Sequence, residues 1–304
     1  MNLLDFEYLE NNLDTKDLYG SDSCIANLFL LQDKYNIQLK IHKNILFRYY
    51  YGDENRSGYG FPIPVKGHSD DFLKIALEFI FEDSKAQNRP ASFCLITQEQ
   101  KNKIDSCLAV NFPECRISWK TNRDDCDYIY LQENLAQLPG SHYQKKRNHI
   151  SRFNRTYGTS WEFKSFPEND IASDILAVSQ KWYEEKDGDS NSILQLEHAS
   201  IKSALENADL LRIRGGVLYI NGQPAAMTLA SPISESILDV IYEKAVSEYE
   251  KNGAYAVINQ QFSKHCGSFL YLNREEDMGV EGLRKAKLSY KPSIILEKFY
   301  GTIQ

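Results

Sequence analysis

Two short segments of the sequence concentrate basic side chains, the composition expected where a protein binds an anionic group. The first segment, residues 141–155 (SHYQKKRNHISRFNR), contains five Lys or Arg residues and no acidic residue. On a helix, Lys145, Arg152 and Arg155 share one broad face. Such a face suits the phosphate of a nucleotide-type cofactor or of an RNA end, although a solvent-exposed basic helix packed between domains would have the same composition.

The second basic segment, residues 279–292 (GVEGLRKAKLSYKP), has a helical pattern. Leu283, Ala286 and Tyr290 recur at a spacing that predicts one buried face. Lys287 stands at the edge of that face, where a lysine can bury its stem and direct its ammonium group into a cleft. Tyr290 could act as a general acid, or be an ordinary core aromatic with a hydrated hydroxyl group.

Polar residues follow a predicted strand shortly before the second basic segment. In residues 270–277 (LYLNREED), an apolar run leads directly into Asn273, Arg274 and Glu275. The carboxyl ends of strands are where open α/β sheets bind their ligands. We therefore consider this segment a candidate substrate site, with an ordinary polar loop as the alternative.

A further candidate combines a strand with the start of a helix. Tyr242 and Glu243 lie on a predicted strand, and residues 251–253 (KNG) precede a predicted helix. Backbone amides at a helix start can bind a phosphate or a carboxylate. The segment holds one glycine, so its match to an anion-binding loop is partial.

Several other kinds of site lack support in the sequence. No G-x-S-x-G, G-x-x-x-x-G-K-[ST], G-x-G-x-x-G or H-E-x-x-H motif occurs, and the six histidines show no metal-ligand spacing. The six cysteines form no C-x-x-C pair, and His265-Cys266 has no evident orienting acid. We expect no metal site, no permanently bound cofactor, and reduced thiols as in a cytoplasmic protein.

Length and charge restrict the class of protein. The 304 residues suffice for two domains, and a hydrophobic content of 42% can supply their cores. The formal net charge of −7 argues against a protein that coats nucleic acid or an anionic membrane with its whole surface. No stretch approaches the roughly 18 apolar residues of a membrane helix, and residues 1–10 do not resemble a signal peptide.

The elements that must position these residues are predicted in one order, twice. The elements of the first half are a hairpin over 37–51, a short strand near 59–63, a helix at 70–85, a strand at 92–97, a helix at 98–108 and a strand at 128–131. Those of the second half are helices at 170–185 and 192–207, a hairpin over 210–232 that turns at Asn221-Gly222, a strand at 236–245, a helix at 253–264, a strand at 268–272, a helix at 279–290 and a strand at 294–300. This repetition predicts two mixed α/β domains of one design, residues 1–138 and 139–304, with the active site in the second.

Three segments together resemble a known family: residues 21–30 (SDSCIANLFL), 130–155 (YLQENLAQLPGSHYQKKRNHISRFNR) and 272–292 (LNREEDMGVEGLRKAKLSYKP). That family includes the C-terminal region of phosphatidylglycerol lysyltransferases, belongs to the Gcn5-related acetyltransferase-like (GNAT) superfamily, and is related to the Fem-type aminoacyltransferases of cell-wall peptide synthesis. The resemblance implies a tandem duplicated acetyltransferase-like fold of the α/β type, with mixed (α+β) sheets. It also implies a transferase in which an amine or hydroxyl group attacks an acyl group activated on tRNA or coenzyme A.

We assign roles in such a reaction to the candidate residues. Lys287 and Arg274 would stabilise charge, Glu243 or Glu275 would act as the base, and Tyr290 as the acid. The predicted substrate-binding residues are Tyr242, Asn273 and Arg274. The predicted phosphate- and donor-binding residues are Lys145, Lys146, Arg147, Lys251, Asn252 and Gly253.

The resemblance leaves open which donor and which acceptor this protein uses. The lysyltransferases carry a membrane flippase region that this sequence lacks, which favours a small-molecule or peptide acceptor over a lipid. The partial anion loop favours aminoacyl-tRNA over acyl-CoA as the donor, with the tRNA acceptor end resting on residues 141–155. The alternative is a non-catalytic module of the same fold that holds a small ligand or a partner protein. Convergence of Glu243, Asn273, Arg274 and Lys287 on one cavity would favour the enzyme.

Overall fold

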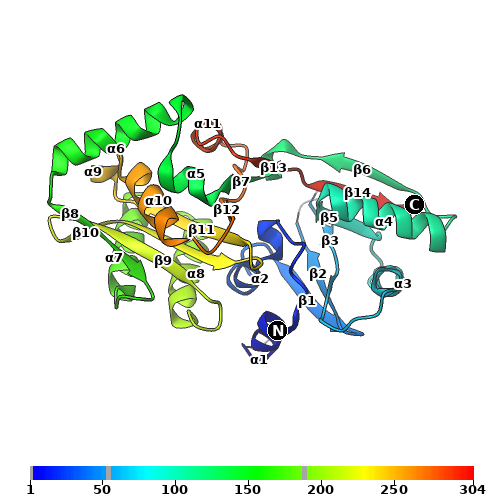
Figure 1. The fold of residues 1–304 in the computed structure, drawn as a ribbon. Coiled ribbons are helices and arrows are strands. Elements are labelled where there is room, and N and C mark those ends of the chain that lie inside the picture. Colours follow the sequence, from blue (N-terminus) through cyan, green and yellow to red (C-terminus); the bar gives the residue numbers. More distant parts are fainter. Residues whose placement is uncertain (1–2, 53–55, 187–189) are drawn as a thin grey trace.

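The computed structural model describes residues 3–52, 56–186 and 190–304, which form two sheets covered by helices (Figure 1). The strands of the first sheet are β1 (Ile37–His42), β2 (Ile45–Tyr50), β3 (Gly58–Tyr59), β4 (Ile63–Pro64), β5 (Ser92–Ile96), β6 (Ile117–Thr121) and β14 (Phe299–Ile303). Those of the second are β7 (Asp127–Leu131), β8 (Trp161–Phe166), β9 (Arg214–Ile220), β10 (Gln223–Pro232), β11 (Ile237–Ala245), β12 (Tyr271–Asn273) and β13 (Ile294–Leu296).

The helices divide between the two sheets in Figure 1. The α-helices are α1 (Leu3–Asn12), α2 (Ile25–Leu30), α3 (Phe72–Ala86), α4 (Gln98–Asn111), α5 (Gln132–Gln137), α6 (Gln144–Tyr157), α7 (Ala172–Glu185), α8 (Ser192–Glu206), α9 (Ser247–Glu250), α10 (Ala254–His265) and α11 (Glu281–Leu288). The short 3-10 helices of the described residues are η1 (Ser21–Ser23), η2 (Arg123–Asp125) and η3 (Ser141–Tyr143). Helices α3 and α4 pack on the first sheet, whereas α7 and α8 cover one face of the second sheet and α5, α6 and α10 the other.

Both predicted hairpins are present. Strands β1 and β2 pair antiparallel, with Ile37 opposite Tyr50. In the second hairpin, β9 and β10 are joined by Asn221 and Gly222, whose φ angles of 51° and 73° are both positive. Two positive φ angles are what a two-residue type I′ turn requires, and they explain why the turn uses Asn-Gly.

Both sheets are mixed, as the repeated order of elements predicted. The first sheet runs β1-β2-β3-β5-β14-β6, with β4 beside β2, and the second runs β13-β7-β12-β11-β10-β9-β8. Most neighbours are antiparallel, but β3 is parallel to β5 and β11 is parallel to β12. The β11–β12 pair belongs to the second sheet and leads into the candidate segment that follows β12.

The two sheets exchange strands, which the sequence did not predict. The expected strand at 294–300 is two strands: β13 pairs with β7 in the second sheet, whereas β14 lies between β5 and β6 in the first. Strand β7, N-terminal to the expected boundary at residue 138, also belongs to the second sheet. The predicted division into 1–138 and 139–304 therefore does not coincide with the division between the sheets, because strand pairing depends on contacts distant in sequence.

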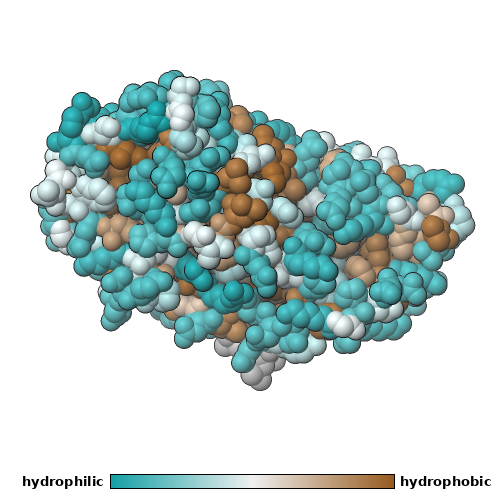
Figure 2. Space-filling model, viewed as in Figure 1, coloured by the Kyte–Doolittle hydropathy of each residue, from teal (hydrophilic) through white to brown (hydrophobic). Residues whose placement is uncertain are grey.

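A continuous core joins the two halves. The largest cluster of buried apolar residues includes α1, α2, β2 and β4 from the first half, together with α7, α8 and the α7-facing side of the second sheet. On the outside, Figure 2 shows a mostly hydrophilic face with a brown patch over the region where β13, β7 and β12 lie in Figure 1. The large apolar side chains exposed in and around these elements are Leu270, Met278, Val280, Leu288 and Ile295.

The position of β14 generates a prediction about Gly301. A Cβ atom at Gly301 would lie 2.7 Å from Cε3 of Trp119, whose indole nitrogen is fixed by a 2.8 Å hydrogen bond to Asp105. Gly301→Ala should therefore destabilise the protein by about 1–3 kcal/mol through overpacking, measured by urea unfolding. Gly267→Ala is the matched control, because no atom lies within 4 Å of its Cβ position. Equal unfolding midpoints for the two variants would contradict the close packing of β14 on β6.

Candidate active site

A cavity of about 330 Å³ lies between the two sheets and α2, and we call it the inter-sheet cavity. It is lined by apolar and aromatic side chains at one side, including Leu28, Leu31, Leu95 and Tyr50. Among the described residues, its charged lining comprises five carboxylates and three cations: Asp22, Asp125, Asp127, Glu275 and Glu276, and Lys34, Arg56 and Lys298. Both halves of the chain therefore contribute to one site.

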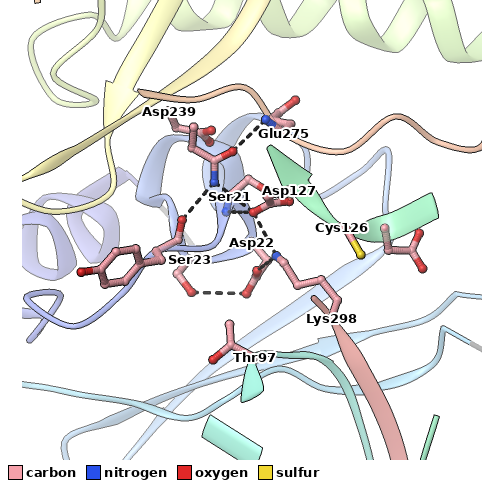
Figure 3. A network of polar contacts seen from close by, with 12 residues as sticks. Ser21, Asp22, Ser23, Thr97, Cys126, Asp127, Asp239, Glu275 and Lys298 are labelled. Atoms are coloured by element: carbon pink, nitrogen blue, oxygen red, sulfur yellow. Dashed lines mark hydrogen bonds and ion pairs between the residues drawn. The ribbon is translucent and has the colours of Figure 1, made fainter. Parts of the chain in front are cut away.

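Lys298 is the central cation of this cavity. Figure 3 shows it extending from the start of the C-terminal strand toward Asp22 and Asp127. Its side chain is 1% exposed, its Nζ bonds to Asp22, and it lies 3.2 Å from Oδ2 of Asp127. Burial opposes its charge, but the carboxylates of Asp127 and Asp22 raise the pKa of Lys298 above its ordinary value. Lys298 is therefore a charged anchor and not a free base.

Asn27, on α2, connects the acidic groups on the other side of the cavity. Its Nδ2 donates to the carbonyl oxygen of Ser21 at 3.1 Å, to Oδ2 of Asp239 at 2.8 Å and to Oε1 of Glu275 at 3.0 Å. Within the described part of the chain, Oδ1 of Asn27 and Oδ1 of Asp239 are buried acceptors without a donor. This corner of the site therefore offers more acceptors than donors.

The carboxyl groups here bind protons more tightly than in water. Burial raises the pKa of Asp239, and the charges of Glu275 and Asp127 raise it further. Burial and the adjacent Glu276 carboxylate likewise raise the pKa of Glu275 to about 8. A carboxyl group with a pKa near neutrality can both accept and donate a proton at working pH.

Two predicted site residues, Asn273 and Lys287, hold the segment 273–276 at the end of β12. Nδ2 of Asn273 donates to Oδ2 of Asp127 and to the carbonyl oxygen of Tyr19, both at 2.9 Å, while its Oδ1 accepts the Glu275 amide at 2.8 Å. The ammonium group of Lys287 donates to the carbonyl oxygens of residues 274, 275 and 276. Both side chains therefore position Glu275. The ammonium group of Lys287 binds the loop carbonyls, and its charge favours the ionised forms of Glu275 and Glu276.

The predicted buried face of the 279–292 helix is wrong in one respect. Ala286 is exposed, and Lys287 is the buried residue of α11. The helix ends at Leu288, and Tyr290 is buried beyond its end. Three backbone carbonyls solvate the ammonium group of Lys287, which makes the burial of a lysine favourable at this position.

A second group of predicted residues lies outside the inter-sheet cavity. We call it the Arg274 cluster and define it as Lys146, Glu243, Asn259, Arg274 and Tyr290. Nη2 of Arg274 is 2.8 Å from Oε1 of Glu243, and Nδ2 of Asn259 donates to Oε2 of the same carboxylate at 3.3 Å. Nζ of Lys146 lies 3.8 Å from the centroid of the Tyr290 ring. Burial and the charge of Arg274 lower the pKa of Lys146 to about 8.

The four residues whose convergence on one cavity would favour an enzyme are therefore divided between two locations. Glu275 lines the cavity, and Asn273 and Lys287 hold its loop, whereas Glu243 and Arg274 pair with each other in the cluster. Tyr242 belongs to neither, since its hydroxyl group is 2.6 Å from Ser200 of α8 within the core.

The two predicted phosphate-binding segments pack against each other. Arg152 of α6 donates to the carbonyl oxygen of Lys251, and Asn252 donates to the hydroxyl group of Tyr157 at 2.8 Å. Gly253 has φ +104°, and the carbonyl oxygen of His149 is 3.0 Å from its Cβ position. The start of α10 is thus covered by α6, which leaves little access for a phosphate at this loop.

On α6 itself, the basic residues differ in their surroundings. Arg147 donates to the carbonyl oxygens of Leu138 and Gly140 at 2.5 and 2.6 Å and so closes the preceding turn. Lys145, Arg152 and Arg155 are exposed. Lys146 is half-buried and reaches the Arg274 cluster.

Sequence reasoning missed most of the cavity's polar lining, above all Asp22, Asn27, Asp127 and Lys298. The signal for two of them was the segment 21–30, which contributes to the family resemblance but contains no cationic or histidine side chain. Asp127 and Lys298 lie in unremarkable strand sequences, and only their pairing in space reveals them.

Nearly the whole chain is similar to a known protein family. Residues 14–301 match the family model described as "Phosphatidylglycerol lysyltransferase, C-terminal". The chain belongs to this family. Membership in the lysyltransferase C-terminal family supports an acyl- or aminoacyltransferase, in agreement with the resemblance found in the sequence.

Solved structures agree on the fold of the family. A conserved protein of unknown function from Bacteroides thetaiotaomicron is 30% identical, with a TM-score of 0.87 over 100% of this chain and 98% of that one. L-PGS from Bacillus licheniformis is 15% identical, with a TM-score of 0.63 over 99% and 91% of the two chains. The predicted fold class, α/β with mixed sheets, is confirmed, and the likeness to these two structures extends over nearly the whole chain.

A sequence relative extends the comparison. An uncharacterised protein of Mycoplasmoides gallisepticum is 23% identical over 234 residues, which are 72% of this chain and 73% of that protein. In the described residues of this chain, no helix combines the length and the apolar character needed to cross a membrane.

The buried anchor generates a stability prediction. Lys298→Met leaves Asp22 and Asp127 buried without their shared cation, so we expect a loss of about 3–5 kcal/mol in the free energy of unfolding. Lys202→Met is the control, because Lys202 forms an exposed ion pair with Glu206 and should contribute less than about 1 kcal/mol. Similar urea midpoints for the two variants would contradict the role of Lys298.

The raised pKa of Glu275 generates a pH prediction. Because the folded protein holds this proton up to about pH 8 whereas the unfolded chain releases it near the ordinary value of 4.5, Glu275 stabilises the fold fully below pH 4.5 and progressively less up to pH 8. Glu275→Gln cannot titrate, so its stability relative to the unmodified protein should increase between pH 5 and 8. Parallel stability curves in urea unfolding across this range would contradict the assignment.

Proposed function

We propose that the protein transfers an aminoacyl group from aminoacyl-tRNA to an amine or hydroxyl acceptor, with the aminoacyl group held in the inter-sheet cavity. The observation that supports this most directly is the charge of the cavity. Each lining cation already has a carboxylate partner: Lys298 has Asp22 and Asp127, Arg56 has Asp125 at 2.5 Å, and Lys34 has Glu197 at 3.8 Å. Glu275 and Glu276 form no ion pair within the described residues.

A ligand with an ammonium group matches this lining. Its positive charge would favour the ionised forms of Glu275 and Glu276, and its N–H groups could supply donors to the free oxygens of Asn27 and Asp239. An aminoacyl group always carries such an ammonium group, whereas an ordinary acyl group does not. The cavity therefore favours an aminoacyl donor over an acyl donor.

Two further observations favour tRNA over coenzyme A as the carrier. The helix start at 251–253, where a cofactor phosphate was expected to bind, is covered by α6. The exposed face of α6 presents Lys145, Arg152 and Arg155 to solvent, and such a face can contact an RNA backbone.

The reaction requires one proton acceptor at the acceptor group. The amine or hydroxyl group would attack the ester carbonyl carbon and pass its proton to Glu275, and the ester C–O bond would then break as Glu275 returns this proton to the departing ribose oxygen. Glu275 suits this role because it lines the cavity and its pKa lies near 8. Glu243, the other predicted base, is paired with Arg274 and lies outside the cavity.

Direct assay of transfer tests the proposal. The protein would be mixed with tRNA charged with radiolabelled lysine, arginine or alanine and with amine, peptide and lipid acceptors, and labelled products would be separated from tRNA. The apolar patch at Leu270 and Ile295 is the reason to include a lipid acceptor. We expect transfer from at least one charged tRNA, with weaker activity at high salt.

A matched pair of variants makes the assay specific. Glu275→Gln should lower turnover by about 10²-fold or more, the usual effect of losing a general base, whereas Lys202→Met should leave it unchanged. Equal turnover by the Glu275→Gln variant and the unmodified protein would show that Glu275 is not the general base. Binding of charged amines to the cavity without transfer from any tested donor would instead favour a non-catalytic binding module.

A further inference from the structure

The Arg274 cluster contains an excess of positive charge in a partly buried location. Lys146 from α6 and Arg274 from the loop after β12 both lie over the ring of Tyr290, with Nζ and Cζ at 3.8 and 5.1 Å from its centroid. Glu243 is the carboxylate of the cluster, and it pairs with Arg274. In the part of the chain that the structure describes, no carboxylate forms an ion pair with Lys146.

Holding two cations together in this way is unfavourable. Both cations lie against the Tyr290 ring, and like charges at such a site repel each other. Burial and the charge of Arg274 accordingly lower the pKa of Lys146 to about 8. The side chain of Arg274 is only 13% exposed, so water screens this repulsion poorly. An anion placed between the two groups would relieve it.

The hydrogen bonds of the cluster are also incomplete. Arg274 uses Nη2 for Glu243, but its Nη1 is buried and has no acceptor among the described residues. Asn259 donates to the same carboxylate, and its Oδ1 is buried without a donor, again counting only described residues. Buried polar atoms of a folded protein are normally hydrogen-bonded, so these two atoms indicate a ligand with both accepting and donating oxygens.

We propose that the Arg274 cluster binds the oxyanion of a phosphate group, which accepts hydrogen bonds from Nη1 of Arg274 and from the ammonium group of Lys146. The planar guanidinium group can bind Glu243 through Nη2 and a phosphate oxygen through Nη1 at the same time. A ribose or phosphate hydroxyl group can donate to Asn259. This location differs from the predicted phosphate site at residues 251–253, which α6 covers.

The site also suggests which phosphate binds there, an identification that rests on the proposed function. Asn273 of β12 binds Asp127 of the cavity wall and Glu275 lines the cavity, whereas Arg274 between them pairs with Glu243 in the cluster. One donor molecule could therefore place its ammonium group in the cavity and a phosphodiester near its 3′ end against Arg274 and Lys146.

Binding of simple probes tests the site without reference to catalysis. Inorganic phosphate, 5′-AMP and acetate would be titrated into the full chain at pH 7 and followed by calorimetry. We expect phosphate and 5′-AMP to bind and acetate to bind more weakly. Lys146→Met keeps the apolar stem over Tyr290 but removes the charge, so phosphate affinity should fall by about tenfold or more.

A second variant predicts a change of the opposite sign. Glu243→Gln removes the carboxylate that competes for Arg274, so it should bind phosphate several-fold more tightly than the unmodified protein. Lys202→Met is the matched control, since it removes an exposed lysine on α8 and should change nothing. Unchanged phosphate affinity in Lys146→Met, or weaker binding in Glu243→Gln, would overturn the proposed site.

The same variants separate this inference from the proposed function. Loss of phosphate binding in Lys146→Met, with no transfer from any charged tRNA, would support the phosphate site and contradict the aminoacyltransferase. If the protein transfers the aminoacyl group but its phosphate affinity is the same in Lys146→Met, the aminoacyltransferase is supported and the phosphate site is contradicted. Competition by both 5′-AMP and inorganic phosphate against charged tRNA would identify the RNA end as the source of the phosphate, and bound phosphate that charged tRNA does not displace would contradict that identification.

Discussion

A buried lysine between two buried carboxylates joins the halves of this protein. Lys298 stands where the chain leaves the second sheet after β13 and enters the first sheet as β14. Asp22 comes from the N-terminal segment and Asp127 from the start of β7, so the ionic contact joins three distant parts of the sequence. Because none of the three side chains is more than 6% exposed, each charge depends on the others for compensation. The crossing of the chain and the wall of the cavity are thereby fixed together.

Local sequence signals were sufficient for most of the elements. The Asn221-Gly222 turn, the alternation around residues 43–44 and the helical periodicities all reflect interactions within a few residues, and the structure confirms the two hairpins. The exchange of β7 and β14 between sheets could not be predicted in this way. Residues 299–303 could pair with β7, as β13 does, or with β5 and β6. The choice depends on partners about 180 to 200 residues away in the sequence.

The candidate residues around β12 lie close together in the structure, and their roles in catalysis stay a prediction. Asn273, Arg274 and Glu275 were considered one candidate site because they stand at the carboxyl end of a predicted strand. Arg274 follows the end of β12 and pairs with Glu243, whereas Glu275 has a positive φ of 54° and lines the cavity, so the two side chains diverge where the chain turns. Lys287 was expected to direct its ammonium group into a cleft, but it donates to three backbone carbonyl oxygens. Helical spacing contains no information about these carbonyl groups. The outcome is a loop that separates an acceptor-rich cavity from a donor-rich cluster.

The placement of β14 also has a consequence for synthesis of the protein on the ribosome. Strands β5 and β6 are complete once residue 121 has been made, yet they have no direct pairing with each other, since β14 lies between them. The facing edges of β5 and β6 therefore stay unpaired until residues 299–303 have emerged from the ribosome. Although it is encoded first, the N-terminal half should reach its native form last, and it should depend on the second half for its completion.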